Sequence, residues 1–343
     1  MRGPCAGEKA DARACLRVVL VRHAEASTFK RPPKTTTMSD FEPVKVSEAM
    51  STGLTQPYEL SEDQLASYER DGFLILRDLL DQPMTEEIQA WSKAVHDAPY
   101  EPGKWMPYEE QREDGTRVLC RTENFADFHS GFNTLFRGKR MLSILEKINQ
   151  EPMVLFKEKI NYKHPGAGGF DAHTDAPAYQ HAGTLKHLTI NMAVDEANQE
   201  NGCLEVVPGS HKMQVPIGDD NCIEHEWESK QTWVPVFLQP GDTLVFGSFL
   251  AHRSGSNRSA KRRAAIYATF NAISDGGDRH TAYYIKRRKE WPPTQERIQG
   301  EDYSMGAKLY GFGSPMWGAT DMSRLQTTRL GTTGSVRSAQ ASV

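Results

Sequence analysis

The chain has 343 residues, of which 38% are hydrophobic and 25% charged, and its formal net charge is −4. These values fit a globular protein with a large core and give no reason to expect nucleic-acid or membrane partners. The five cysteines are scattered and odd in number, which favours a reducing, cytoplasmic compartment over a disulfide framework.

Residues 1–55 are interpreted as a poorly ordered N-terminal extension. Within it, Cys15–Ser27 reads CLRVVLVRHAEAS, and its Arg-His-Ala-Glu resembles the opening motif of the histidine phosphatases. A working phosphatase would need a further α/β domain with a second histidine, whereas the sequence that follows carries other motifs. A start at Met38 would remove the segment.

The ordered domain is expected to span residues 56–313. Ser61 followed by Gln64 has the pattern of a capping box, which predicts a short helix that ends at Gly72. The elements expected next are a strand at 73–80, a helix at 84–96, a loop at 99–116 and a strand at 117–121.

The stretch KEKINYKHPGAGGFDAHTD, at 157–175, opens with an alternating strand. Its polar face carries Lys157, Lys159, Asn161 and Lys163. Several buried cations without partners would be unfavourable, so an anion is expected beside them; the alternative is an edge strand with its lysines in water. Lys159 and Asn161 are the preferred pocket residues.

His173 and Asp175 close this stretch. Residues two apart in an extended chain point to the same side, so the two side chains are expected to face one point. Together they provide two of the three ligands of the facial triad that holds non-haem iron(II). His252, after a predicted strand–turn–strand, is the expected third ligand. His164 and His181 are alternative ligands, but neither has a partner at a suitable spacing.

Two later strands carry further polar residues. Arg263 opens an alternating strand that ends near Asn271, and an Arg at the inward end of a strand can grip a carboxylate with two parallel N–H bonds. Another alternating strand, at 187–194, has Thr189 and Asn191 on one face.

These motifs resemble the phytanoyl-CoA dioxygenase family. The residues that carry the resemblance are His173-X-Asp175, His252, Ser254, Arg263 and the block Glu200–His211, which contains NGCL and PGSH. The similarity covers roughly residues 60–271. His-X-Asp alone is common, whereas this ordered combination is specific.

The resemblance implies a mainly β fold with flanking helices: a double-stranded β-helix, or jelly-roll, cupin-like barrel. It also implies an iron(II)- and 2-oxoglutarate-dependent dioxygenase in which His173, Asp175 and His252 hold the metal. Arg263, helped by Ser254, would hold the far carboxylate of 2-oxoglutarate. Such enzymes convert 2-oxoglutarate and O2 to succinate and CO2 and hydroxylate a substrate C–H bond.

The remaining pocket predictions combine this resemblance, for Arg121 and Asn191, with the strand faces described above, for Lys159, Asn161 and Thr189. Arg121 aligns with a family Lys that contacts 2-oxoglutarate, so Arg121 and Lys159 are candidates for cosubstrate or substrate; a solvated Arg121 is the alternative. Asn191 stands where several relatives have a Trp near 2-oxoglutarate, and together with Thr189 it is expected to make the cofactor pocket more polar. Asn161 is expected to bind substrate.

The runs KEKINYK, HRSGSNRS and TAYYIKRR resemble the branch of the family that hydroxylates phosphonates, typified by 2-aminoethylphosphonate dioxygenases. A small polar anion is therefore the expected substrate. The alternatives are a specialised-metabolite dioxygenase of the same family and a non-catalytic binding barrel. Tyr283, Tyr284 and Trp291 are expected in a lid or dimer segment, and residues 314–343 in a disordered tail.

Overall fold

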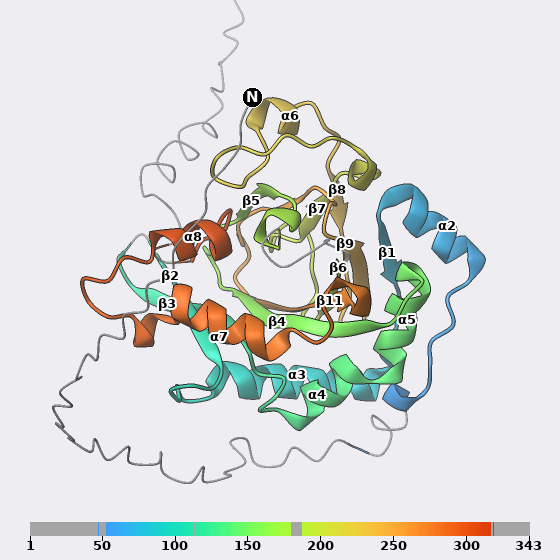
Figure 1. Ribbon diagram of the computed structural model, residues 1–343, viewed down its shortest axis with the longest axis horizontal. Coiled ribbons are helices and arrows are strands. Elements are labelled where there is room, and N and C mark those ends of the chain that lie inside the picture. Colours follow the sequence, from blue (N-terminus) through green and yellow to red (C-terminus); the bar gives the residue numbers. More distant parts are fainter. Residues whose placement is uncertain (1–46, 48–52, 113, 180–186, 317, 319–343) are drawn as a thin grey trace, which may run out of the picture. The chain divides into compact units, whose positions relative to one another are not determined.

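The computed structural model describes residues 47, 53–112, 114–179, 187–316 and 318 (Figure 1). The motif at Cys15–Ser27, the alternative start at Met38 and His181 lie outside these ranges, as does most of the predicted tail. The described residues all belong to one unit, Ser39–Val343.

Two antiparallel sheets form the centre of this unit. The larger sheet has the strand order β1 (Phe73–Leu76), β9 (Thr243–Gly247), β6 (His187–Ala193), β11 (Arg263–Ala272), β4 (Met153–Lys163), β3 (Arg117–Glu123) and β2 (Met106–Gln111). The smaller sheet has the order β5 (Phe170–His173), β10 (His252–Ser254), β7 (Leu204–Val206) and β8 (Val234–Val236). In Figure 1, β5 and β7 lie opposite β4 and β11. This confirms the predicted mainly β, double-stranded β-helix fold.

The polar strand β4 lies inside the larger sheet. It pairs with β11 on one side and with β3 on the other, so the alternative of an edge strand is wrong. Ile160 and Tyr162 belong to the core on the outer face of the sheet. Because side chains alternate along a strand, the Lys157–Lys163 polar face points into the barrel.

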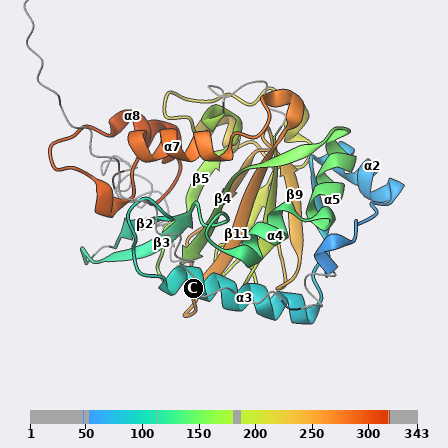
Figure 2. The same cartoon turned by 60° about the horizontal axis from the view of Figure 1, so that its bottom comes forward.

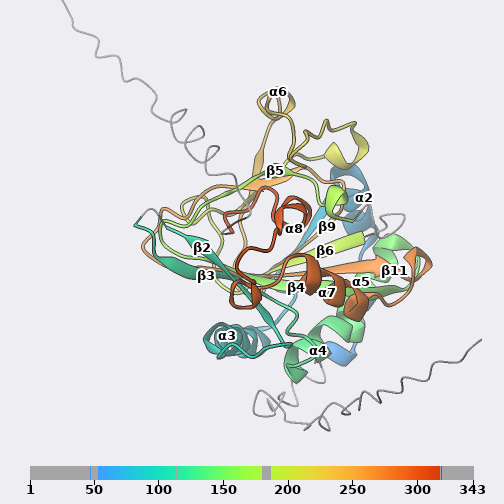
Figure 3. The same cartoon turned by 60° about the vertical axis from the view of Figure 1, so that its left-hand side comes forward.

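Helices cover the outer face of the larger sheet. The predicted capping box at Ser61 is present and begins α2 (Glu62–Asp71), which ends at Gly72 with φ 81°. Three further helices supply apolar side chains to the core beneath the sheet: α3 (Gln82–Asp97), α4 (Ser130–Arg137) and α5 (Lys139–Asn149). Figures 2 and 3 show α3 and α4 on the side of β4 away from the smaller sheet.

Two local predictions were wrong. The expected loop at 99–116 contains β2, an edge strand paired with β3, and Pro107 within it is tolerated because an edge position leaves one side unpaired. The strand expected at 73–80 ends at Leu76, and the chain then forms a turn.

The C-terminal part packs on the barrel as α7 (His280–Glu290) and α8 (Ser304–Tyr310) (Figure 3). Tyr283, Tyr284 and Trp291 are buried in a shared apolar cluster. Order continues past the expected boundary at 313, because Met316 is 1% exposed and forms a β-bridge with Glu110. Within the described ranges, no helix combines the length and apolar character needed to cross a bilayer.

Candidate active site

His173, Asp175 and His252 come together at one point of the barrel interior. One ligand atom from each residue lies within 4.8 Å of the others. His173 and His252 are direct cross-strand partners on β5 and β10, and their ring centroids are 4.1 Å apart. His252 is buried, whereas Asp175 is partly exposed. The three residues predicted as metal ligands are therefore adjacent in space.

Asp175 reaches this point by a different route from the one the alternation predicts. Strand β5 ends at His173, and Asp175 has helical backbone angles as the residue before the 3-10 turn η1 (Ala176–Ala178). The strand places the histidine and the turn places the carboxylate. The predicted proximity is present, although the assumption of one continuous strand was wrong.

Backbone hydrogen bonds orient both imidazoles. His173 Nδ1 lies 2.7 Å from the Asp171 carbonyl, and His252 Nδ1 lies 3.0 Å from the Leu250 carbonyl. Because a carbonyl only accepts, each Nδ1 carries the proton and each Nε2 presents a lone pair. This is the ring orientation that a divalent metal needs.

The electrostatics also favour the ligating protonation states. Burial lowers the pKa of His173 to about 3 and lowers the pKa of His252, so both rings are neutral at neutral pH. Burial opposes ionisation of Asp175, but His252, Lys157 and Lys159 outweigh it and lower the pKa of this carboxyl group. Two neutral imidazoles and a carboxylate form the donor set of a non-haem iron(II) site.

A pocket on one side of His173, here named the Arg263 pocket, contains most of the predicted cosubstrate residues. Besides His173, His252 and Arg253, its polar lining comes from Lys159, Asn161, Ser254, Arg263 and Tyr267. Arg263 is 4% exposed, and its Nε has no hydrogen-bond partner among the described residues. A buried guanidinium N–H without a partner fits a carboxylate ligand, because leaving a buried donor unpaired is unfavourable.

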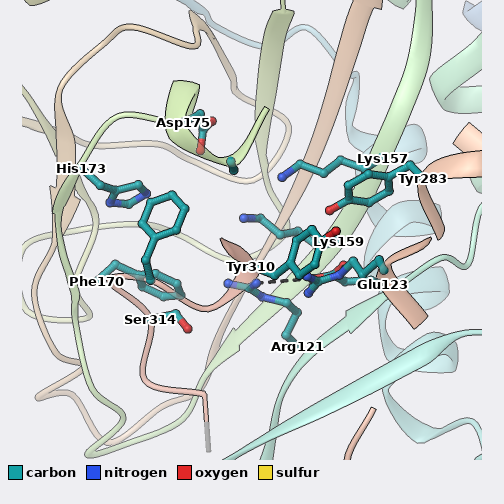
Figure 4. Close-up of a pocket in the computed structure, with 13 residues that line it drawn as sticks. Arg121, Glu123, Lys157, Lys159, Phe170, His173, Asp175, Tyr283, Tyr310 and Ser314 are labelled. Carbon is teal, nitrogen blue, oxygen red and sulfur yellow. Dashed lines mark hydrogen bonds and ion pairs between the residues drawn. The ribbon is translucent and has the colours of Figure 1, made fainter. Parts of the chain in front are cut away.

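A second pocket, here named the Lys157 pocket, adjoins the first and shares Lys159, Phe170 and His173 with it. The charged groups that line it are Arg121, Glu123, Lys157, Lys159, Asp175 and Arg287. Figure 4 shows the amines of Lys157 and Lys159 extending toward the side of the pocket that holds His173 and Asp175. The pocket therefore has four cationic side chains and two carboxylates.

The two carboxylates already have roles. Glu123 accepts two hydrogen bonds from Arg287, at 2.6 and 2.8 Å, and lies 3.3 Å from Arg121 Nη1. Asp175 belongs to the metal cluster. Lys157 and Lys159 have no hydrogen-bond acceptor within the described parts of the chain, and burial lowers the pKa of both amines, that of Lys157 to about 8. The donors of this pocket that lack an acceptor are therefore the two lysine amines, and an anion beside them would favour their charged forms.

The other predicted pocket residues occupy distinct places. Arg121 is 4% exposed rather than solvated, and its Nε donates to Asn161 Oδ1 at 2.9 Å. Asn161 lines the Arg263 pocket and not the Lys157 pocket, so it lies on the predicted cosubstrate side. Thr189 Oγ1 lies 3.5 Å from Asp175 Oδ2. Asn191 is buried beside Tyr267, its partner across the β6–β11 pair, and is absent from the lining of both pockets.

His164, an alternative ligand, lies 3.0 Å from the Leu119 carbonyl and is not part of the cluster. Several pocket residues were not predicted, namely Glu123, Tyr283, Arg287, Tyr310 and Phe312. All except Glu123 come from the C-terminal segment, whose run TAYYIKRR contains Tyr283 and Arg287 and carries part of the resemblance but was not assigned to the pocket. The density of Tyr and Arg at 283–288 was the available signal.

The facing sheets and the His/Asp/His cluster define the class of non-haem iron oxygenases built on a double-stranded β-helix. The sequence profile of the phytanoyl-CoA dioxygenase (PhyH) family matches residues 68–265. The chain belongs to this family, and its members named below are dioxygenases and hydroxylases.

Three relatives align with most of this chain. A 2-aminoethylphosphonate dioxygenase of an uncultured bacterium is 36% identical over 75% of this chain and 98% of its own. A methylphosphonate hydroxylase of Gimesia maris is 37% identical over 67% and 87%. The dioxygenase lolE1 of Epichloe uncinata is 34% identical over 72% and 97%.

Solved structures agree on the fold. EctD from S. alaskensis, crystallised with 2-oxoglutarate and 5-hydroxyectoine, has a TM-score of 0.56 at 19% identity and covers 65% of this chain and 82% of its own. The epimerase SnoN, crystallised with Fe3+, α-ketoglutarate and nogalamycin RO, has a TM-score of 0.54 at 20% identity and covers 62% and 83%.

Proposed function

We propose that this dioxygenase hydroxylates a C–H bond of a small phosphonate. Iron(II) would be held by His173, Asp175 and His252, and 2-oxoglutarate would place its far carboxylate on Arg263. One oxygen atom of O2 ends in the hydroxylated product and the other in succinate, with release of CO2. The bound iron supplies the activation of O2.

The observation that carries the substrate class is the pair Lys157 and Lys159. Both amines border the pocket next to the metal cluster, and neither has an acceptor among the described side chains. Desolvated cations are stabilised by an anion. The carboxylate expected on Arg263 lies in the other pocket, so a second anion is needed here.

Neighbouring side chains hold Arg121, Lys157 and Lys159 in place for this anion. Arg121 is held by Asn161 and Glu123, so its guanidinium is fixed before substrate arrives. Lys157 lies over the ring of Tyr179 and Lys159 over that of Tyr267, at 4.6 and 5.2 Å from the ring centroids. A compact group with several anionic oxygens can meet three such cations at once, which favours a phosphonate over a monocarboxylate.

The relatives support the same substrate class. Two of the three are named for phosphonates, 2-aminoethylphosphonate and methylphosphonate. The third is named as a dioxygenase without a substrate, which keeps a specialised metabolite as the second candidate. A binding barrel without catalysis would not need the preset tautomers of His173 and His252.

The metal site is tested by succinate release from 2-oxoglutarate under air with iron(II). His173→Ala and His252→Ala are each expected to abolish it. His164→Ala is the matched control, because His164 is a partly buried histidine of the same barrel outside the cluster. Succinate release at the unmodified rate by either cluster variant would contradict the assignment.

The substrate class is tested with methylphosphonate, 2-aminoethylphosphonate, matched carboxylates and acyl-CoA. Turnover is expected with a phosphonate. Lys157→Met and Lys159→Met are expected to raise its KM by about tenfold or more, since each removes one charged contact. Turnover only with acyl-CoA or an apolar metabolite would exclude the phosphonate and leave the metal site unaffected.

A cytoplasmic location without nucleic-acid or membrane partners is part of the proposal. It is supported by the buried free thiols of Cys120, Cys203 and Cys222.

A further inference from the structure

A buried lysine amine contacts Ser254, one of the residues that line the Arg263 pocket. Lys163 is the last residue of β4, pairs with Arg263 across the sheet and is 3% exposed. Its Nζ donates to Ser254 Oγ at 2.9 Å, to the Gly202 carbonyl at 3.3 Å and to the Gly255 carbonyl. An ammonium has three N–H donors and no acceptor, so these three oxygens use its full donor capacity.

This arrangement determines what the Ser254 hydroxyl can do. A serine oxygen accepts through its lone pairs and has one proton to donate. Because Lys163 donates to Oγ, that proton must point elsewhere. Ser254 lines the Arg263 pocket, where the Arg263 Nε–H also has no partner among the described residues. The pocket lining thus offers two donors, one N–H from Arg263 and one O–H from Ser254, and a carboxylate has two oxygens to accept from them.

We propose that Lys163 is a positioning residue for the cosubstrate: it directs the Ser254 hydroxyl to donate to the far carboxylate of 2-oxoglutarate beside Arg263. The inference rests on the proposed function, because it takes 2-oxoglutarate as the occupant of this pocket. Lys163 itself does not touch the cosubstrate.

A neutral Lys163 would orient the Ser254 hydroxyl the other way. A neutral amine has a lone pair, so it could accept the Ser254 proton and turn the hydroxyl away from the pocket. Burial lowers the pKa of Lys163, and the neighbouring Arg263 lowers it further. A carboxylate beside Arg263 offsets this repulsion. Cosubstrate and Lys163 therefore support each other's charge state.

The glycine of the NGCL motif leaves space for this ammonium. Gly202 has φ +72°, and a Cβ at this position would lie 3.0 Å from Lys163 Nζ and 2.3 Å from the Gly255 carbonyl oxygen. A side chain here would displace both partners of the contact. The glycine in this motif is therefore needed for the Lys163 contact as well as for the turn.

The test is the Kd of the full chain loaded with iron(II), measured by calorimetry without O2. Lys163→Met and Ser254→Ala are each expected to weaken 2-oxoglutarate binding by about tenfold, the value of one hydrogen bond to a charged group. The double variant is expected to bind no more weakly than either single variant, because the two residues act as one unit. Pyruvate, a 2-oxo acid without the far carboxylate, is the control ligand, and its weaker binding should be unchanged.

Additive losses, or equal weakening of pyruvate and 2-oxoglutarate, would overturn the positioning role. If Lys163→Met does not fold, Lys163→Gln replaces it, because its amide keeps two donors for the Gly202 and Gly255 carbonyls. A folded Lys163→Gln protein that binds 2-oxoglutarate with unmodified affinity would overturn the role as well. An unmodified protein that fails to bind 2-oxoglutarate would overturn the proposed cosubstrate itself together with this inference.

Discussion

The ion pair between Glu123 and Arg287 joins the C-terminal helix to the barrel, and its removal makes a quantitative prediction. Both side chains are at most 4% exposed, and the guanidinium makes two hydrogen bonds to the carboxylate. Burial raises the pKa of Glu123, but Arg287 and Arg121 outweigh it, so the carboxyl group stays ionised. Arg287→Met would leave this buried charge with Arg121 alone, at 3.3 Å.

Removing one partner of a buried ion pair lowers the free energy of unfolding by about 3–5 kcal/mol. Because Arg121 remains, the lower end of this range is expected for Arg287→Met. Arg288→Met is the matched control: Arg288 follows directly on the same helix but is partly exposed and bonds Glu296. Its loss should lower the free energy of unfolding by about 1 kcal/mol or less.

Urea unfolding of the full chain, followed by tryptophan fluorescence, gives both values. The double variant Glu123→Gln with Arg287→Met removes both charges of the pair but keeps an amide oxygen that can accept from Arg121, so it should regain part of the stability lost by Arg287→Met alone. Equal losses for Arg287→Met and Arg288→Met would refute the reasoning, as would a double variant no more stable than Arg287→Met.

Three further predictions concern the cosubstrate, the pH dependence and the N-terminus. Arg263→Lys keeps the charge but loses the planar fork, so the KM for 2-oxoglutarate should rise about tenfold and the KM for substrate should change little; equal changes would indicate a structural Arg. His280 lies 2.7 Å from Glu158 and 3.3 Å from Asp127, and although burial opposes protonation, these carboxylates raise its pKa to about 9. The protonated His280 therefore stabilises the fold fully below about pH 6.5, and this stabilisation is lost as the pH rises through 9. The free energy of unfolding should fall over this pH range in the unmodified protein and in His225→Asn, whose side chain is exposed. The fall should be absent in His280→Asn. A chain that begins at Met38 should retain turnover. If that shortened chain folds but has no turnover, part of the site lies in the extension.

Short-range patterns predicted the centre of the site. His173 and Asp175 are two residues apart, and Ser254 follows His252 by two, so local geometry determines where these side chains lie once the barrel forms. The alternation of β4 predicted the inward cationic face for the same reason. It favoured Lys159 and Asn161, which both line the Arg263 pocket, and passed over Lys157, which lines the Lys157 pocket, and Lys163, which contacts Ser254. The alternation of a strand shows which side chains share a face. The groups that those side chains contact depend on the opposite sheet, which the alternation does not describe.

The outer wall of the Lys157 pocket could not be predicted in this way. Glu123 and Arg287 are 164 residues apart in the chain, and their pairing depends on where α7 docks. That docking is driven by a cluster of aromatic side chains, including Tyr108 from β2 and Trp291 after α7. Sequence periodicity shows that such residues will be buried, but not which surface covers them. The missed strand β2 belongs to the same cluster, so both errors have one cause.

The inward face of β4 explains how one barrel can hold two anions beside a metal. Residues two apart on a strand are about 7 Å apart, so Lys157 and Lys159 are separated by about the length of a small dicarboxylate and Lys159 and Lys163 by about twice that distance. Lys159 lies in the shared lining of both pockets, next to the metal cluster. Lys157 lines the pocket proposed for substrate, and Lys163 contacts Ser254, through which it is proposed to position the cosubstrate. The lysines that border these two pockets therefore come from one interior strand, where an anion must lose its water.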